Sequence, residues 1–579
     1  MVQQWLERFN AFLVRRDVSG LEELFGAESY WRDRLAFTWN IITMEGLGQI
    51  RAMLRQAPAA QFVLDGETEQ VDGLLSAWLR FETAVGRGKA HLRLKDGKAF
   101  TLLTSLEELK GFEEKQGSTR EQGIAHGARK NRENWLQRKT AEETELGYAR
   151  QPYCVIIGGG QGGIALGARL QRLGVATLIL EKNATAGDSW RNRYRSLVLH
   201  DPVWYDHLPY IPFPSHWPVF TPKDKMGDWL EMYVKVMELN YWTSSECQHA
   251  SFDAHTRQWT VRVKRDGADV ILTPKHLVFA TGSYGPPRMP QIPGAATFKG
   301  PQFHSSAYQS GEAFRGKRVV VVGANSSAHD ICADLWEHDA QATMIQRSPT
   351  TVVQSETLME LAFKGLYSED AVRAGIDVDK ADLLFASTPF RLLPQGQTPL
   401  AARMAERDAG LLSRLNAAGF KTDLGEDNTG QMMKAFRTGS GYYLDVGCSE
   451  LIASGQVAVR SGVEPREITQ NGVVLSDGSK LDADAIIFAT GYLPMTEWVA
   501  KIVSRDVAER IGPNWGYGSG TKGDPGPWLG ELRNMWKPLA QEALWFHGGN
   551  LHLSRHYSKY VALQLKARME GIETPVYGA

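Results

Sequence analysis

The stretch YCVIIGGGQGGIALGARLQRLGVATLILEK, residues 153–182, decides the fold. An apolar run ends in a cluster of glycines, a stretch with helical periodicity follows, and a second apolar run ends at Glu181. This order is typical of a βαβ unit that binds a dinucleotide. Gly158 permits the tight turn, Gly160 lets the backbone approach a pyrophosphate, and Gly163 allows the helix to pack on the strand. We therefore expect a dinucleotide here, with Glu181 at its ribose hydroxyls.

A second unit of this kind begins at KRVVVVGANSSAHDICADL, residues 317–335, and reaches its next strand at ATMIQRS, residues 342–348. Its glycines are partly replaced. Gly323 keeps the first position, Asn325 stands at the second and Ala328 at the third. Asparagine tolerates left-handed backbone geometry better than most residues, and alanine is permitted at the packing position, so the turn is retained.

The end of this second unit differs from the end of the first. Arg347 and Ser348 follow the second strand, where the first unit has the acid Glu181. A cation and a hydroxyl suit a 2′-phosphate, which favours NADPH over NADH. Ser326 and Ser327 begin the helix and are expected beside the phosphates.

Two further apolar strands end in glycine turns. LVFATGSYGPP, residues 277–287, turns at Gly282 before the second unit, and IIFATGYLP, residues 486–494, turns at Gly491 after it. Such strands mark where a chain leaves one dinucleotide domain and later returns. We expect an α/β fold with two nested Rossmann-type dinucleotide-binding domains: 151–296 and 441–579 for the first, and 297–440, with a helical insertion, for the second.

The first 112 residues predict a different, α+β unit. Trp5 and Phe9 lie on the apolar stripe of a helix, and Ser19 with Glu22 has the spacing of a capping box that predicts a second helix. Alternating strands flank the turn dipeptide Asp96–Gly97. Together with YWRDRLAFTWNI, this order resembles the cone-shaped fold of the SnoaL-like or nuclear-transport-factor-like superfamily. The resemblance implies a structural or dimerising role, so a homodimer through this domain is an expectation.

Residues 113–150 are dense in charge and nearly empty of large apolar side chains, which predicts a linker. Across the chain the net charge is −1, with 43% apolar and 23% charged residues, and this composition gives no general attraction to nucleic acid or acidic membranes. The start lacks a basic leader with an apolar run, so we expect neither a signal peptide nor a membrane span. The cysteines form no CxxC pair, which favours a reducing cytoplasm and predicts no metal site.

FKGPQFHSSAY, residues 298–308, lies between the two βαβ units. Its pattern F-x-G-x-x-x-H-x-x-x-Y is met by Phe298, Gly300, His304 and Tyr308, and it resembles the identifying motif of flavin-containing monooxygenases. In the sister Baeyer–Villiger group the last position is tryptophan. His304 and Tyr308 are candidate catalytic residues that we expect to hold the two domains in register.

GDSWRNRY, the two FATG turns and LWFHGGNLHLSRHYSKYVALQLKA agree with the same family, so the resemblance covers about residues 150–579. It implies FAD on the first unit and NADPH on the second. It also implies hydride transfer to FAD, a flavin hydroperoxide formed with dioxygen, and transfer of one oxygen atom to a small organic substrate, most often at nitrogen or sulfur. The further cofactor contacts that it implies are Gly187, Trp190, Thr281, Gly282, Gly491 and Asn550.

One position departs from this pattern. RSLVLHDPVWY places His200 where relatives that oxygenate amines carry an asparagine near the flavin, so His200 is a third candidate catalytic residue. A histidine there is similar to the YUCCA-type enzymes, which decarboxylate an arylpyruvate oxidatively. That reaction, Baeyer–Villiger oxidation of a ketone, and a non-catalytic redox-sensing or ligand-binding flavoprotein stay open as alternatives. A thiol–disulfide reductase is disfavoured because it needs a cysteine pair.

Overall fold

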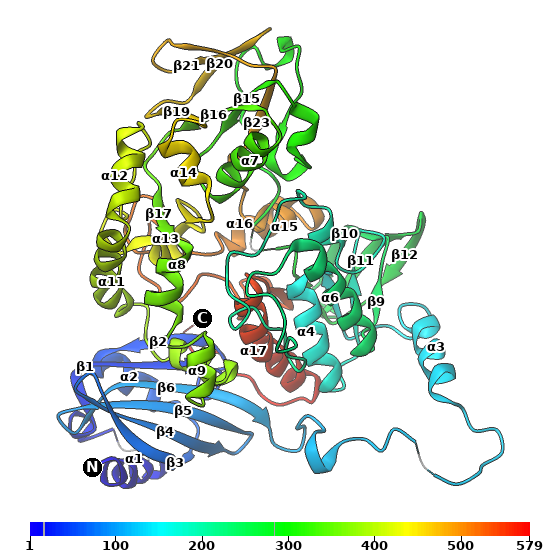
Figure 1. Cartoon of the computed structure of the whole chain (residues 1–579). Helices are drawn as coiled ribbons and strands as arrows, with labels where there is room; N and C mark the ends of the chain where they lie inside the picture. The colour runs from blue at the N-terminus through cyan, green and yellow to red at the C-terminus, as the bar shows by residue number, and fades with distance from the viewer. Residues whose placement is uncertain (16–17, 125, 283, 579) are drawn as a thin grey trace.

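The computed structural model describes residues 1–15, 18–124, 126–282 and 284–578. Figure 1 shows three lobes: an N-terminal lobe in blue at the bottom, a first α/β lobe on the right and a second α/β lobe at the top. The last helix, α17 (Leu551–Met569), packs on the first α/β lobe and also contacts the N-terminal sheet. Among the described helices, none combines the length and apolar character needed to cross a bilayer.

The N-terminal lobe is a six-stranded sheet of order β2-β1-β6-β5-β4-β3, antiparallel except between β1 and β6. Its elements are α1 (Val2–Arg15), β1 (Phe25–Arg34), β2 (Ile41–Glu45), α2 (Gly46–Leu54), β3 (Ala60–Val71), β4 (Leu74–Thr83), β5 (Gly86–Lys95) and β6 (Lys98–Leu109). The predicted hairpin is confirmed, because Asp96 and Gly97 join β5 to β6 with φ of 51° and 80°. The helix predicted after Ser19 is wrong: only a 3-10 turn forms, at Leu21–Glu23, before β1 begins.

Aromatic side chains fill the space between α1 and its face of the sheet. Phe9 lies 5.7 Å from Trp31 and 5.2 Å from Phe62, and Phe62 lies 5.0 Å from Phe81, measured between ring centroids. Asp33, on the same side, is buried and accepts hydrogen bonds from Thr38 and Thr104. This interior is therefore a packed core, in which Asp33 fixes a turn.

The first α/β lobe is built on a five-stranded parallel sheet of order β24-β13-β7-β8-β9. Its strands are β7 (Cys154–Ile157), β8 (Thr177–Leu180), β9 (Tyr241–Trp242), β13 (His276–Phe279) and β24 (Leu544–Phe546). A three-stranded sheet of β10 (Ser245–Asp253), β11 (Gln258–Arg265) and β12 (Ala268–Leu272) adjoins it. The lobe's helices are α4 (Gln161–Arg172), α5 (Asp188–Arg191), α6 (Lys223–Val236), α15 (Thr496–Ile502), α16 (Arg505–Ile511) and α17.

The second α/β lobe interrupts the first between β13 and β24. Its parallel sheet has the order β14-β23-β15-β16-β19. The elements are β14 (Gln302–His304), β15 (Arg318–Val322), α7 (Ser326–Glu337), β16 (Gln341–Gln346), α14 (Cys448–Ala453), β19 (Ala458–Ser461), β20 (Pro465–Thr469), β21 (Gly472–Leu475), β22 (Lys480–Asp482) and β23 (Ala485–Phe488). The predicted boundary at residue 440 is too early, because β19 and β23 pair within this second sheet, which ends at Phe488.

A helical insertion separates the paired strands β17 (Thr351–Gln354) and β18 (Tyr442–Asp445). Its helices are α8 (Ser355–Leu358), α9 (Glu369–Arg373), α10 (Val378–Ala386), α11 (Leu393–Arg407), α12 (Ala409–Ala417) and α13 (Gly430–Thr438). Leu383 and Ala386 of α10 pack against Trp78 and Leu103 of the N-terminal sheet. The insertion thus reaches from the second α/β lobe down to the N-terminal lobe (Figure 1).

The predicted linker runs outward before it returns to the first α/β lobe (Figure 1). It contains the exposed helix α3 (Trp135–Glu145), capped by Asn134. The indole nitrogen of Trp135 donates a hydrogen bond to Glu238 at 2.9 Å, and Asn240 donates to Glu142 at 3.1 Å, so α3 is attached to the lobe.

A buried ion pair joins the N-terminal lobe to the first α/β lobe. Arg32 of β1 donates to both carboxylate oxygens of Glu531 at 2.6 and 2.7 Å, and its third donor reaches the carbonyl oxygen of Ala386 at 2.8 Å. The two side chains are only 4% and 3% exposed. Burial opposes ionisation of Glu531, yet the Arg32 charge holds its pKa below the ordinary value.

We predict that Arg32→Met lowers the free energy of unfolding by about 3–5 kcal/mol, because it leaves the Glu531 carboxylate buried without its partner. Urea unfolding followed by tryptophan fluorescence measures the change. The matched control is Arg505→Met, which removes a solvent-exposed pair with Glu497 and should leave the unfolding midpoint nearly unchanged. Equal small shifts in both variants would contradict a stabilising role for the buried pair.

Candidate active site

The first glycine loop connects β7 to α4, as predicted. Gly158 has φ of 108°, and a Cβ there would lie 2.4 Å from the carbonyl oxygen of Ala280. A Cβ at Gly163 would lie 2.0 Å from the carbonyl oxygen of Gly158. Both glycines are therefore required by the packing of the protein itself.

Gly160 is different, because nothing in the chain requires a glycine there. Its φ is −76°, and a Cβ would meet only Ser189 Oγ at 3.5 Å, an ordinary contact. The hydroxyls of Ser189 and Thr281 beside this loop are buried and have no hydrogen-bond partner among the described residues. An open backbone at a helix N-terminus with two unpaired hydroxyls fits the phosphates of a dinucleotide.

Glu181 ends β8 next to this loop. Its carboxylate accepts hydrogen bonds from the backbone nitrogens of Gly159 at 3.0 Å and Asn183 at 2.8 Å. Burial raises the pKa of Glu181. The carboxylate is thus fixed at the wall of the cavity described below, where it was predicted to meet a ribose.

The GDSW element lies against the same loop. Gly187, with φ of 92°, begins α5, and the indole nitrogen of Trp190 donates to Gln161 Oε1 at 3.2 Å. Gln161 in turn donates to the carbonyl oxygen of Gly549. Gly282, with φ of 96°, forms the predicted turn after β13. The sequence motifs therefore meet at one place in the fold.

Asn550 caps α17 and connects it to two residues, Asp201 and Tyr205, that the sequence analysis did not select as site residues. Its Oδ1 accepts from the backbone of Leu553 at 3.0 Å, while its Nδ2 lies 3.4 Å from the Tyr205 hydroxyl and 3.5 Å from Asp201 Oδ2. Burial raises the pKa of Asp201. Asp201 directly follows His200, and its position beside the cap is visible only in the folded chain.

The second glycine loop connects β15 to α7. Gly323 has φ of 132°, and a Cβ there would lie 2.3 Å from the carbonyl oxygen of Ala489. Asn325 is extended, with φ of −107°, so the left-handed geometry considered for it is not used. Ser326 and Ser327 form the first turn of α7. The predicted turn is retained because Gly323 alone takes the left-handed conformation.

Arg347 and Ser348 follow β16 directly and are exposed. Arg347 has no ion-pair partner among the described residues, so its guanidinium is free to bind an anion from solvent. Its place at the end of the strand after the glycine loop is the one that the sequence predicted.

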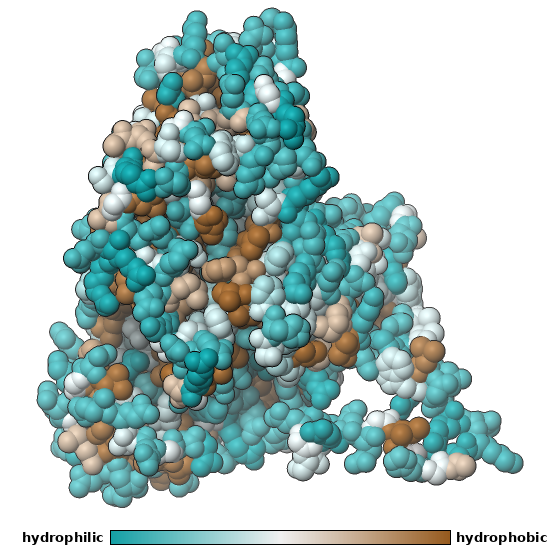
Figure 2. Space-filling model, viewed as in Figure 1, coloured by the Kyte–Doolittle hydropathy of each residue, from teal (hydrophilic) through white to brown (hydrophobic). Residues whose placement is uncertain are grey.

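A large cavity of about 1450 Å³ links the first glycine loop to the helical insertion and the N-terminal sheet. Its lining includes Gly158, Gly160, Glu181, Ser189, Trp190, Asp201, Tyr205, Thr281, Gly282 and Asn550 from the first α/β lobe, Phe363, Tyr367, Lys380 and Phe385 from the insertion, and Ser76, Trp78, His91 and Arg93 from the N-terminal lobe. Figure 2 shows apolar side chains gathered in the middle of the visible face, between the insertion and the first α/β lobe. Three parts of the chain thus enclose one space.

The motif histidine and tyrosine lie behind this cavity and are absent from its wall. His304 Nε2 is 2.9 Å from the carbonyl oxygen of Gly491, and Tyr308 donates to Asp334 of α7 at 2.5 Å. These bonds tie the connector to the second FATG turn and to the helix of the second glycine loop. The role of these two residues in holding the lobes in register stays a prediction.

His200 also lies outside the wall of the cavity. Its Nε2 is 3.6 Å from Asp330 of α7, a carboxylate that also accepts a hydrogen bond from Tyr194 at 2.6 Å. His200 therefore bridges the first α/β lobe to α7, and its neighbour Asp201 is the side chain that faces the cavity.

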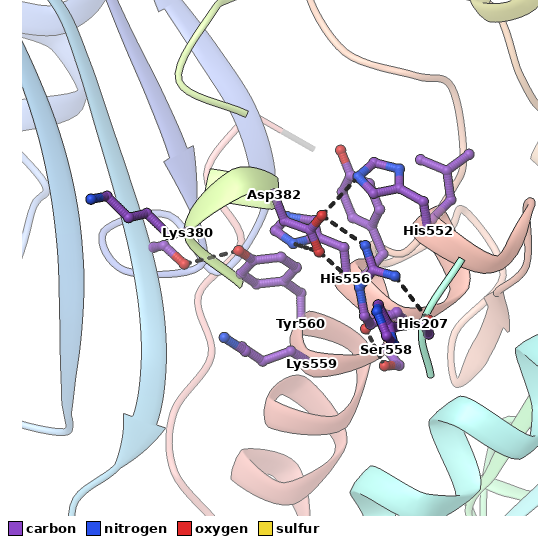
Figure 3. A network of polar contacts seen from close by, with 12 residues as sticks. His207, Lys380, Asp382, His552, His556, Ser558, Lys559 and Tyr560 are labelled. Carbon is purple, nitrogen blue, oxygen red and sulfur yellow. Dashed lines mark hydrogen bonds and ion pairs between the residues drawn. The ribbon is translucent and has the colours of Figure 1, made fainter. Parts of the chain in front are cut away.

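A buried polar network lies behind the cavity wall, centred on Asp382 of α10 (Figure 3). Arg555 donates to both oxygens of Asp382 at 2.8 and 3.0 Å, and His552 lies 3.2 Å from one of them. Tyr367 donates to Asp382 at 3.0 Å, and His552 stacks on Tyr205. This network fixes Tyr205 and Tyr367, two side chains of the cavity wall. Its members are far apart in sequence, so no local pattern reveals it.

The four cysteines are buried and free. Burial raises the pKa of every thiol, and raises that of Cys247 to about 12. Buried thiols of this kind are poor nucleophiles, which disfavours thiol–disulfide chemistry.

Comparisons with known proteins agree with this geometry. A family model described as pyridine nucleotide-disulphide oxidoreductase matches residues 155–364. The chain is 33% identical to indole-3-pyruvate monooxygenase YUCCA1 of Oryza sativa subsp. japonica over 342 residues, which is 59% of this chain and 77% of that protein. It is 32% identical over 357 residues to a probable indole-3-pyruvate monooxygenase, YUCCA4, of Arabidopsis thaliana, covering 61% and 78% of the two chains.

The chain belongs to the flavin-containing monooxygenase family. It is an NADPH- and dioxygen-dependent flavin monooxygenase that uses FAD. Among solved structures, the fold is similar to an open form of cyclohexanone monooxygenase, with a TM-score of 0.52, 19% identity and coverage of 72% of this chain and 88% of that one. It is also similar to OTEMO in complex with FAD and NADP, with a TM-score of 0.51, 20% identity and coverage of 73% of this chain and 86% of that one.

Proposed function

We propose that FAD binds the first glycine loop and NADPH the second, and that the substrate enters the cavity beside the first loop. The observation that carries this proposal is the convergence at that loop of an open backbone at Gly160, two unpaired buried hydroxyls and the carboxylate of Glu181. Bound there, FAD would accept a hydride from NADPH and activate dioxygen. Exposed Arg347 suits the 2′-phosphate of NADPH.

The residues of the chain then have three tasks. Ser189, Thr281 and the amides of the first loop hold the phosphates of FAD. The contacts of His304 and Tyr308 fix the relative position of the two lobes, and so the path between the two cofactors. The insertion and the N-terminal lobe cover the cavity and exclude water from the reaction.

We further propose that the substrate is an aromatic 2-oxo acid, oxidised at its carbonyl carbon with loss of carbon dioxide. The support is the 33% identity to an indole-3-pyruvate monooxygenase over 77% of that protein, together with aromatic and cationic side chains in one cavity. N- or S-oxygenation, favoured by the motif alone, uses the same cofactors and is the second candidate.

We propose that the N-terminal lobe is a SnoaL-like domain, supported by its helix α1 packed on one face of a six-stranded sheet, and that its role is to complete the cavity. One face of its sheet is filled by aromatic rings, and Trp78 and Leu103 on the other face are covered by α10. The face against α10 is therefore not free to form a homodimer. A cytoplasmic location stays a prediction from the sequence.

The substrate proposal predicts coupled turnover of an arylpyruvate. With purified holoenzyme and NADPH, phenylpyruvate should give oxygen uptake, carbon dioxide release and little hydrogen peroxide. A tertiary amine, a thioether and the neutral ketone phenylacetone serve as comparisons. Coupled oxidation of the amine or thioether without carbon dioxide release from phenylpyruvate would favour the second candidate, and peroxide release with every compound would indicate an oxidase.

The FAD proposal predicts opposite outcomes for two glycines of one loop. Gly160→Ala should fold normally but bind FAD about 10- to 100-fold more weakly, because the methyl group holds the pyrophosphate away from backbone donors. Gly158→Ala should lose folded protein, because its Cβ meets the Ala280 carbonyl. Circular dichroism reports folding, and flavin absorbance reports occupancy. Full FAD occupancy in folded Gly160→Ala would place the cofactor elsewhere.

The NADPH proposal predicts that Arg347→Ala raises the KM for NADPH about 10- to 100-fold and leaves the KM for NADH unchanged, since only NADPH carries the 2′-phosphate. Steady-state oxidation of each coenzyme measures this. Arg460→Ala, at an exposed arginine of neighbouring β19, is the matched control and should change neither KM. If Arg347→Ala changed the KM for NADPH and the KM for NADH equally, a contact between Arg347 and the 2′-phosphate would be contradicted.

A further inference from the structure

The cavity ends against the N-terminal sheet, on strands β4 and β5. Ser76 pairs with Arg93 and Trp78 pairs with His91 across these strands. All four side chains line the cavity, so they lie on the face that is turned away from the aromatic core of the lobe. This end of the cavity is built by a part of the chain that lies outside the family match at residues 155–364.

Two cations meet at this end without a carboxylate partner. Arg93 comes from β5 and Lys380 from α10, and both line the cavity. Among the described residues neither forms an ion pair, and Arg93 has only long contacts of 3.4 Å to Ser387 and Thr388. Figure 3 shows the Lys380 side chain extended toward the N-terminal strands, away from Asp382. Glu69 lines the same cavity and the charge of Asp72 acts on Arg93, but among the described residues neither acid forms an ion pair with Arg93 or Lys380.

His91 lies near enough to feel both charges, and one of its ring nitrogens has no partner among the described residues. Its side chain is 2% exposed, its Nε2 is 2.9 Å from Ser76 Oγ, and its Nδ1 has no partner among the described residues. Burial, followed by the charges of Arg93 and Lys380, lowers the pKa of His91 to about 3, so the ring is neutral at physiological pH. A neutral ring whose Nε2 accepts from Ser76 carries an N–H on Nδ1 that can donate to an anion.

The wall next to these groups is aromatic. Trp78 lies 4.6 Å from His91 between ring centroids, and Phe385 of the insertion lines the same space. Phe363 and Tyr367 of the insertion add further aromatic side chains to the lining of the cavity. A ligand with a flat apolar body and one anionic end would satisfy every unpaired group here.

We propose that the N-terminal lobe supplies the anion-binding end of the substrate cavity, where Arg93 and Lys380 bind the carboxylate of an aromatic acid and Trp78 contacts its ring. This inference rests on the proposed function for the identity of the cavity as the substrate site. It gives the added lobe a defined task, which is selection of anionic over neutral substrates.

The test separates binding from turnover by using probes that cannot react. Binding of 3-phenylpropionate and of its neutral isostere 3-phenylpropanamide to the FAD-loaded full chain is measured by isothermal titration calorimetry. The variants are Arg93→Gln, Arg93→Lys and Lys380→Met. The matched control is Arg80→Gln on neighbouring β4, which lies outside the cavity wall and is paired with Asp65.

We expect the wild-type chain to bind 3-phenylpropionate about 10- to 100-fold more tightly than 3-phenylpropanamide. This ratio corresponds to one charge-assisted hydrogen bond that the amide cannot make. Arg93→Gln and Lys380→Met should each lower this ratio of affinities. Arg93→Lys, which keeps the positive charge, should retain most of it, and Arg80→Gln should leave it unchanged. Binding of the amide should change little in any variant. If phenylpyruvate is not turned over, the proposed function is wrong, but the measured difference in affinity between the two probes still stands.

Three outcomes would overturn the inference. One is equal wild-type affinity for the two probes, or no binding of 3-phenylpropionate. Another is an equal loss of affinity for both probes in Arg93→Gln, which would show that Arg93 only supports the contact between β5 and the insertion. The third is full displacement of 3-phenylpropionate by saturating NADP⁺, which would assign the two cations to a coenzyme phosphate.

Discussion

The carboxylate of Asp382 joins three parts of the chain that are distant in sequence. It belongs to α10 of the insertion, it is held by Arg555 and His552 of α17, and it lies 3.6 Å from His556, which contacts Arg34 of the N-terminal lobe. Burial opposes its ionisation, but the charge of Arg555 holds the pKa of Asp382 well below its usual range. A buried carboxylate with this many partners fixes geometry, because moving it would leave the buried Arg555 guanidinium without its counter-charge.

The shape of the cavity follows from that constraint. Arg555 also donates to the carbonyl oxygens of Tyr205 and His207, so the segment after His200 is held by the same arginine that holds α10. The cavity wall beside Asp382 is therefore positioned by charge-assisted bonds behind it, while the aromatic side chains of Tyr205 and Tyr367 face the cavity. Such an arrangement keeps the wall rigid without placing strong permanent partners where a substrate must bind.

The sequence predicted the two glycine loops, their strands and the nesting of the lobes, because each depends on residues adjacent in the chain. Gly158, Gly163 and Gly323 are required by backbone contacts that their motifs encode directly. The limit of the second lobe at Phe488 was missed, because strand pairing across a long insertion leaves no local pattern. Asp201 and the Asp382 network were missed for the same reason: their partners come from α17 and the insertion.

The strand that contains His91 and Arg93 shows how an accurate local pattern led to an incomplete interpretation. In HLRLK the apolar residues alternate with polar ones, and the structure does bury Leu92 and Leu94 in the core of the N-terminal lobe. The same alternation places His91 and Arg93 on the opposite face of the sheet. From the sequence alone, that polar face is predicted to be exposed to solvent. In the folded chain the insertion packs on that face, the face lines one end of a cavity, and His91 is almost fully buried. Because an isolated sheet would gain nothing from a buried histidine with one unpaired nitrogen near two cations, the polar face of β5 is better explained by a ligand than by solvent.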